Sequence, residues 1–208
     1  MEQPNRRYTV GIYLFDEVEV LDFAGPFEVF AVTDELSEYK YFEVCTISVD
    51  GQQVKARNGL KVQPDYSFEN HPPLDILVIP GGMGTRAAIK DERHLNWITQ
   101  VQPHTQITMS VCTGSLLLGK LGLLDNLPAT THHTVFDLFR KISPKTEVIT
   151  NQRFVDNGHI MTAGGISAGI DLSLHVVEKL YGKETVIKTI KEMEYGDLWK
   201  EEALVDKA

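Results

Sequence analysis

Residues 106–119 read QITMSVCTGSLLLG, and this stretch decides how the rest of the chain is interpreted. Its first part is apolar and compatible with a strand, and the small residues after Cys112 allow a sharp turn before the leucines begin a helix. We therefore predict a buried strand that delivers Cys112 to the amino end of a helix. Unpaired N–H groups and the helix dipole favour a thiolate there, so Cys112 is a candidate nucleophile. From this stretch alone, a buried structural cysteine is the alternative.

Working outward, short apolar runs predict further buried strands, and periodic segments between them predict helices. Strands are expected at residues 8–15, 41–49, 76–80 and 147–150, with hairpins at 54–62 and 154–162. Helices are expected at residues 26–36, 92–101, 134–142, 170–181 and 183–195, with Pro26 as the first residue of its helix. Alternating strands and helices predict a doubly wound, mostly parallel α/β sheet with helices on both faces, as in flavodoxin-like folds.

Four segments carry chemistry at the ends of these strands. Asp22, the pair Gly81-Gly82, Cys112 and the pair Gly164-Gly165 each fall just beyond a predicted strand. Ligands of open α/β sheets bind outside the carboxyl ends of the strands. A thiol, an acid and backbone donors on one edge are the parts that covalent catalysis needs, and we predict a reactive site there.

Other candidate residues have plainer interpretations. Cys45 lies in a predicted strand and is expected to fill the core. His132 and His133 could approach the thiol, although histidines near a helix start are more often capping or hydrogen-bonding groups, and their role stays open. His159, on a predicted hairpin, is expected to be structural.

Composition limits the function classes. The chain has 208 residues, of which 42% are hydrophobic, and we expect one domain over residues 1–208. A net charge of -9 without clustered Lys and Arg argues against a nucleic-acid surface. The polar amino terminus, short apolar runs and two cysteines indicate a cytoplasmic protein without signal peptide, membrane span or disulfide framework. Zinc-ligand spacings do not occur, so no metal or other cofactor is expected.

Five motifs carry a family resemblance. LDFAGPFEVF, VIPGG, SVCTGSLLLGKLGLLDN, ATTHH and MTAGGISAGIDLSLHVVE resemble, in this order, the motifs of the ThiJ/PfpI superfamily with the class I glutamine amidotransferase-like fold. Together they cover the chain from about Tyr8 to Tyr195, and they are most similar to the motifs of isonitrile hydratases. The sensor domains of AraC-type regulators share them. The helix-turn-helix region of those regulators is not expected here, since the chain ends at Ala208.

The resemblance implies roles for individual residues. Cys112 would be the nucleophile and Asp22 the acid beside it. The backbone N–H groups of Gly82 and Thr113 would form an oxyanion-type hole, and the Thr113 hydroxyl could hydrogen-bond the thiol or an intermediate. Peptidase-like members carry a histidine at the position of Thr113, so protease or amidase activity is not favoured.

The same resemblance implies a substrate-binding edge and a small-molecule substrate. Gly81 would lie at this edge, and Ile166, at the turn with Gly165, would line the pocket. An apolar pocket with few polar groups would suit a small, weakly polar isocyanide. We expect Cys112 to be largely a thiolate near neutral pH and Asp22 to be largely protonated, since two neighbouring acids share a proton.

The expected activity is that of a hydro-lyase that converts organic isocyanides to N-substituted formamides through a covalent thioimidate. Two alternatives stay open: a glyoxalase-like or other hydrolase activity on the same scaffold, and a non-catalytic sensor in which Cys112 is oxidised. Families of this kind commonly form homodimers, so a homodimer is expected by resemblance. The physiological substrate cannot be read from the motifs.

Overall fold

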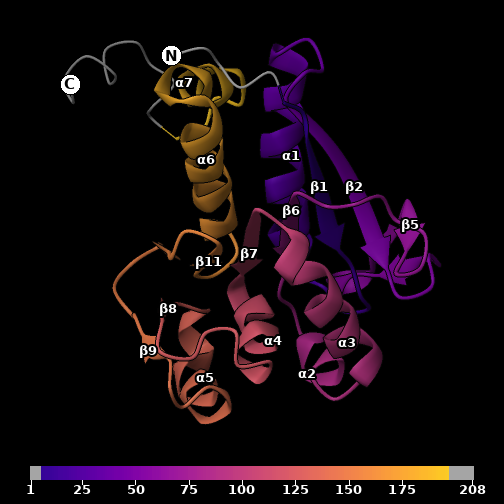
Figure 1. The fold of residues 1–208 in the computed structure, drawn as a ribbon, viewed down its shortest axis with the longest axis vertical. Coiled ribbons are helices and arrows are strands. Elements are labelled where there is room, and N and C mark those ends of the chain that lie inside the picture. The colour runs from indigo at the N-terminus through magenta and orange to yellow at the C-terminus, as the bar shows by residue number, and fades with distance from the viewer. Residues whose placement is uncertain (1–5, 197–208) are drawn as a thin grey trace.

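A seven-stranded sheet forms the centre of the molecule (Figure 1). The computed structural model describes residues 6–196. The strands of this sheet are β1 Tyr8–Tyr13, β2 Phe42–Ser48, β5 Tyr66–Ser67, β6 Ile76–Ile79, β7 Ile107–Val111, β10 Phe154–Asp156 and β11 Ile160–Ala163. Their order is β10-β11-β7-β6-β1-β2-β5, and every pairing is parallel except that of β10 with β11. This confirms the predicted mostly parallel α/β sheet.

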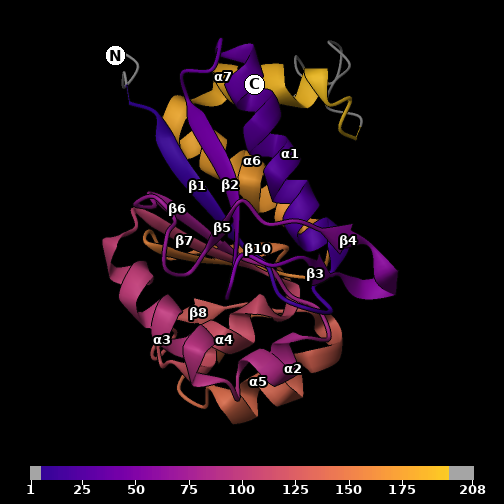
Figure 2. The same cartoon turned by 90° about the vertical axis from the view of Figure 1, so that its right-hand side faces the viewer.

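Helices cover both faces of this sheet, as Figure 2 shows. One layer holds α1 Val20–Leu36, α6 Ala168–Tyr181 and α7 Lys183–Glu192, which pack on one another. The other layer holds α2 Thr85–Ala88, α3 Glu92–Val101, α4 Ser115–Lys120 and α5 Phe136–Ile142. Because both faces are covered, all residues of β6 and β7 are buried, as expected for parallel strands without polar alternation.

Two small strand pairs lie outside the main sheet. The predicted hairpin at residues 54–62 is confirmed, with β3 Val54–Lys55 antiparallel to β4 Lys61–Val62. The second pair joins β8 Pro128–Ala129 to β9 Glu147–Val148 in parallel. The predicted hairpin at residues 154–162 corresponds to the antiparallel pair of β10 and β11.

The start of α1 differs from the prediction. The helix begins at Val20, so Pro26 lies in its interior and Asp22 lies in its first turn, not in a loop before the helix. An interior proline has no N–H for the carbonyl four residues earlier, which here is that of Asp22. The helix tolerates this loss because its apolar side chains, among them Phe23 and Phe30, are buried in the core.

Buried apolar side chains from the sheet and both helical layers form one contiguous core. Within residues 6–196, none of the helices combines the length and the hydrophobicity that a membrane crossing requires. The predicted single domain, residues 1–208, includes both terminal stretches that lie outside the described residues.

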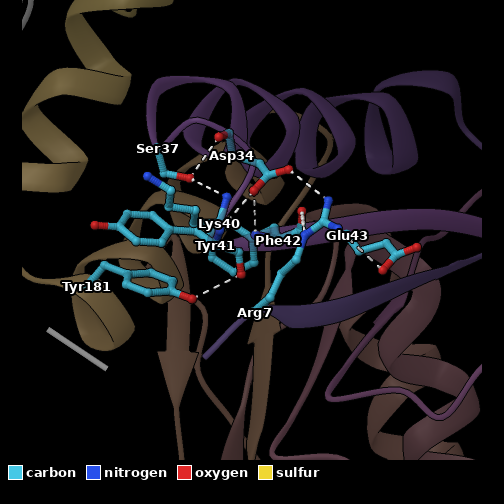
Figure 3. Close-up of polar contacts among 8 residues, drawn as sticks. All are labelled: Arg7, Asp34, Ser37, Lys40, Tyr41, Phe42, Glu43 and Tyr181. Atoms are coloured by element: carbon cyan, nitrogen blue, oxygen red, sulfur yellow. Dashed lines mark hydrogen bonds and ion pairs between the residues drawn. The ribbon is translucent and has the colours of Figure 1, made fainter. Parts of the chain in front are cut away.

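A buried carboxylate joins the end of α1 to β2 (Figure 3). Asp34 accepts hydrogen bonds from the backbone N–H groups of Tyr41 and Phe42, both at 2.9 Å, and from Arg7 at 3.2 Å. The ring of Tyr41 stacks on that of Tyr181 with centroids 3.9 Å apart, and the Tyr181 hydroxyl donates to the Tyr41 carbonyl. The carboxyl end of α6 is therefore fixed against β2, at the end of this helix remote from the predicted site.

Candidate active site

Cys112 follows β7 directly, at a sharp turn into α4. Its φ of 56° lies in the left-handed region, which costs a residue other than glycine about 1–3 kcal/mol. The surrounding chain holds this conformation: the Cys112 N–H donates to the Gly164 carbonyl at 2.8 Å, and the Cys112 carbonyl accepts from the hydroxyls of Thr131 at 3.0 Å and Ser115 at 3.2 Å. The structure thus confirms a strained turn at Cys112, which is the backbone arrangement of a nucleophile elbow.

Close approach of this turn to the sheet requires a glycine. A Cβ atom placed on Gly114 would lie 2.0 Å from the carbonyl oxygen of Ile79, the last residue of β6. Real Cβ atoms do not approach a backbone oxygen so closely. The glycine therefore lets the elbow press against β6 and brings Cys112 beside the loop that carries Gly81 and Gly82.

Asp22 lies beside Cys112 and is completely buried. Its Oδ2 accepts a hydrogen bond from the Gly81 N–H at 2.9 Å, while its buried Oδ1 has no hydrogen-bond partner among residues 6–196. Burial raises the pKa of Asp22 from 3.8 to about 7; the Gly81 bond lowers it and the Glu19 charge raises it further. Near neutral pH, Asp22 can therefore both hold and release a proton.

The Cys112 thiol also resists ionisation. Burial, and after it the negative charge of Asp22, raise the pKa of Cys112 to about 12, while the backbone N–H groups of Thr113 and Ile166 lower it. The expectation of a resting thiolate is therefore wrong, because α4 has only six residues and its backbone donors do not offset desolvation. At rest the sulfur keeps its proton, and Asp22 is the group of the pair that titrates near neutral pH.

Thr113 is bound differently from the expectation. Its hydroxyl accepts hydrogen bonds from the Gly82 N–H at 2.9 Å and the Thr85 hydroxyl at 3.2 Å. No hydrogen bond joins this hydroxyl to the thiol among the described residues. The Gly82 N–H is likewise engaged and does not point at an open hole, so Thr113 holds the elbow to the glycine loop, and its own N–H faces the sulfur.

The turn before α6 forms the opposite wall. Ile166 has a φ of 43° and is 37% exposed, and its side chain lines the cavity at Cys112 as expected. Gly165 lies against the ring of His132, close enough that a Cβ would fall 2.4 Å from a ring carbon. Two strained residues, Cys112 and Ile166, thus meet across the site, and such strain clusters at functional positions.

The cavity at Cys112 is small, at about 90 Å³. Met83, Val135 and Ile166 supply apolar walls, but charged and polar side chains line it as well, namely those of Glu19, Arg57, Arg86, His132 and Thr134. The expectation of an apolar pocket with few polar groups therefore holds only for part of the wall. The three charged residues carry no local sequence signal, because only the fold brings these separate segments to one opening.

A larger cavity, about 270 Å³, lies beyond the ends of β1 and β2. Its polar lining includes Asp16, Asp50, Arg93 and His94, and it contains no cysteine. Of these two cavities, only the smaller one is lined by Cys112.

The rings of His132 and His133 lie 4.4 Å apart between centroids, but they line different cavities. His132 lines the cavity at Cys112, and its Nδ1 accepts from the Thr134 N–H at 3.3 Å, whereas His133 lines a neighbouring cavity. Burial lowers the pKa of His132, so the ring is neutral near pH 7. The Nε2 of His159 lies 3.3 Å from the Thr105 hydroxyl, near the amino end of β7, whereas Cys112 follows the carboxyl end of this strand. This position is in keeping with a structural role for His159.

Metal-ligating residues do not gather in the described part of the chain: residues 6–196 contain no group of three or more His, Cys, Asp or Glu side chains arranged to hold an ion.

Cys45, the second cysteine, is buried in β2, and burial raises its pKa to about 12.

The model of the DJ-1/PfpI family matches residues 8–179, a span that includes Asp22, Cys112 and Ile166. The chain belongs to the DJ-1/PfpI family. The elbow cysteine, the glycine loop and the turn before α6 therefore lie within the family's shared fold.

Individual relatives of this DJ-1/PfpI protein differ in what they do. Isonitrile hydratase from Pseudomonas putida is 34% identical over 187 residues, which cover 90% of this chain and 78% of the hydratase. The HTH-type transcriptional regulator GbdR from Pseudomonas aeruginosa is 27% identical and covers 85% of this chain, but the match spans only 47% of the regulator. A solved THiJ/PfpI family protein from Pseudomonas syringae superposes with a TM-score of 0.83 at 26% identity, covering 93% of this chain and 78% of that one.

Proposed function

We propose that this protein hydrates organic isocyanides to N-substituted formamides, with Cys112 as the covalent nucleophile. The observation that carries the proposal is the buried pair of Cys112 and Asp22 at a strained elbow, where Asp22 has a pKa of about 7. Similarity to the isonitrile hydratase of Pseudomonas putida over most of both chains supports this reaction. The activity is thus that of a hydro-lyase.

The first step moves one proton and forms one bond. Asp22 in its carboxylate form takes the proton of Cys112 as the sulfur attacks the terminal carbon of the isocyanide. Asp22 then delivers this proton to the same carbon, where negative charge has built up. The product is a thioimidate, R–N=CH–S–Cys112, and Asp22 is again a carboxylate. A carboxyl group with a pKa near the working pH suits both transfers.

The second step consumes one water. Its oxygen adds to the thioimidate carbon, and one of its protons reaches the nitrogen, which gives R–NH–CH(OH)–S–Cys112. Collapse of this adduct forms the carbonyl of R–NH–CHO and breaks the carbon–sulfur bond, while the hydroxyl proton returns to the sulfur of Cys112. The N–H groups of Thr113 and Ile166, which lower the pKa of Cys112, would stabilise the departing sulfur.

The test is a side-by-side turnover assay of the purified protein with an aryl isocyanide and with methylglyoxal. The proposal predicts formation of the aryl formamide and no comparable loss of methylglyoxal. Turnover of methylglyoxal alone would point to a glyoxalase-like enzyme. Loss of neither substrate, and no turnover of a small alkyl isocyanide suited to the cavity of about 90 Å³, together with oxidation of Cys112 by peroxide, would favour a sensor and refute the hydratase proposal.

We also propose, from the family resemblance, that the protein is a homodimer. Light scattering on the eluting protein should give twice the mass of one chain, which is 23.4 kDa. A mass equal to that of one chain at micromolar concentration would contradict this.

A further inference from the structure

Three charged side chains line the cavity of Cys112, and their charges do not cancel, because one is negative and two are positive. Arg57 forms an ion pair with Glu19, with 2.9 Å between its Nη1 and the Glu19 Oε2. Arg86, from α2, lines the same cavity and has no acidic partner within residues 6–196. One guanidinium at the opening is thus neutralised, and the other remains available.

The remaining groups at the opening do not cancel this charge. His132 is neutral near pH 7 because burial lowers its pKa. Asp22 lies completely buried behind the cysteine and carries only part of a negative charge, since its pKa is about 7. A cationic substrate would meet the free guanidinium of Arg86, a neutral one would gain nothing from it, and an anionic one would be attracted.

We infer that the isocyanide substrate carries a carboxylate, which Arg86 binds while the isocyanide carbon faces Cys112. This inference rests on the proposed hydratase function and deepens it by naming the class of substrate. A guanidinium presents a planar fork of donors that matches a carboxylate with two parallel hydrogen bonds. Arg86 is therefore a specificity-determining residue, separate from the thiol and acid that carry out the reaction.

Size and shape restrict the substrate further. Met83 and Ile166 are 48% and 37% exposed, and both line this cavity together with Cys112, so part of its wall is apolar. A volume of about 90 Å³ is far below the roughly 300–1,000 Å³ of sites for drug-sized ligands. A short carbon chain between carboxylate and isocyanide fits these limits.

A matched pair of probes tests this inference: isocyanoacetate, which carries the carboxylate, and its neutral methyl ester. The wild-type protein should have the higher kcat/KM for the anion, and Arg86→Gln should lower that value about tenfold or more, the range for a hydrogen-bonded charge. The kcat/KM for the neutral methyl ester should change less than twofold in Arg86→Gln. Arg86→Lys, which keeps the charge, should retain part of the preference.

Lys90→Gln is the matched control, because Lys90 is exposed, lies just beyond α2 and does not line the cavity. It removes the same unit of charge and should leave the ratio of the two kcat/KM values unchanged. Equal loss of anion preference in the Arg86→Gln and Lys90→Gln proteins would overturn the inference, because it would show a long-range charge effect. An unchanged ratio in Arg86→Gln would overturn it as well.

A second readout separates this inference from the hydratase proposal. Iodoacetate and iodoacetamide both alkylate a cysteine: the carbon–sulfur bond forms, the carbon–iodine bond breaks, iodide leaves and the thiol proton goes to solvent. The rate ratio at Cys112, normalised to glutathione, should favour iodoacetate and lose this preference in Arg86→Gln. Should no isocyanide react, the hydratase proposal fails while this ratio still reports anion binding. Should isocyanides react without any effect of Arg86, the inference alone fails.

Discussion

Asp22→Asn should abolish most of the isocyanide turnover and, separately, remove the pH dependence that Asp22 gives to the free energy of unfolding. Asparagine keeps the shape of the side chain and can still accept a hydrogen bond from the Gly81 N–H. It can neither take the proton of Cys112 nor deliver a proton to the isocyanide carbon. Isocyanide turnover should fall about 100-fold or more, the usual loss for a general acid or base. Because the charge of Asp22 raises the pKa of Cys112, the variant should also alkylate with iodoacetamide at lower pH than the wild type.

The stability effect follows from the pKa of Asp22. The folded protein holds this proton up to a pKa of about 7, whereas the unfolded chain releases it near 3.8. Between these values the folded state binds more protons, so the free energy of unfolding decreases as pH rises, and the decrease levels off above pH 7. Integrated from pH 5 to pH 8, the wild type should lose about 2.5 kcal/mol, a loss that Asp22→Asn abolishes.

Urea unfolding of both proteins at pH 5 and pH 8 measures this difference. The Asn variant should gain about 2.5 kcal/mol relative to the wild type between the two pH values, while its activity is low at both. A difference in stability that does not change with pH would show that Asp22 is not held near neutrality. Near-normal turnover in the variant would remove Asp22 from the chemistry.

Three further substitutions test other parts of the site. Cys45→Ala should leave turnover unchanged and cost about 1 kcal/mol or less in thermal unfolding, and selective loss of activity in the folded protein would contradict a core role. Thr113→Val removes the acceptor of the buried Gly82 N–H and should lower the free energy of unfolding by about 1–3 kcal/mol. Thr113→Ser keeps the hydroxyl and should retain most of the wild-type stability. Equal unfolding midpoints for the two variants would contradict the role of this hydrogen bond. Gly114→Ala places a methyl group 2.0 Å from the Ile79 carbonyl and should destabilise the fold by about 2 kcal/mol or more while lowering turnover; a normal melting curve with full activity would refute the packing argument.

Strands, and the residues at their carboxyl ends, could be predicted from sequence because apolar runs and glycine punctuation are local signals. The run before Cys112 predicts β7, and the small residues after it predict a sharp turn, but the left-handed φ of Cys112 itself comes only from the structure. The predicted helix at residues 26–36 begins too late, because a proline is a local signal for the first residue of a helix, whereas burial of apolar side chains sustains α1 around an interior Pro26.

Electrostatics and the pocket lining could not be predicted in the same way. The protonation of Cys112 depends on how deeply the elbow is buried and on the distance to Asp22, which only the packed structure gives. The charges at the opening come from three separate segments that carry Glu19, Arg57 and Arg86. No local pattern in the sequence marks these residues as neighbours, because chain folding alone brings them together.

If Cys112 forms the covalent bond to the isocyanide carbon, Cys112→Ala must lose turnover of an aryl isocyanide. The variant should unfold like the wild type, since alanine removes only one small atom from a packed site, and Cys45→Ala serves as the matched cysteine control. Formamide production should disappear in Cys112→Ala and persist in Cys45→Ala. Formamide production by a normally folded Cys112→Ala protein at more than a trace of the wild-type rate would contradict it.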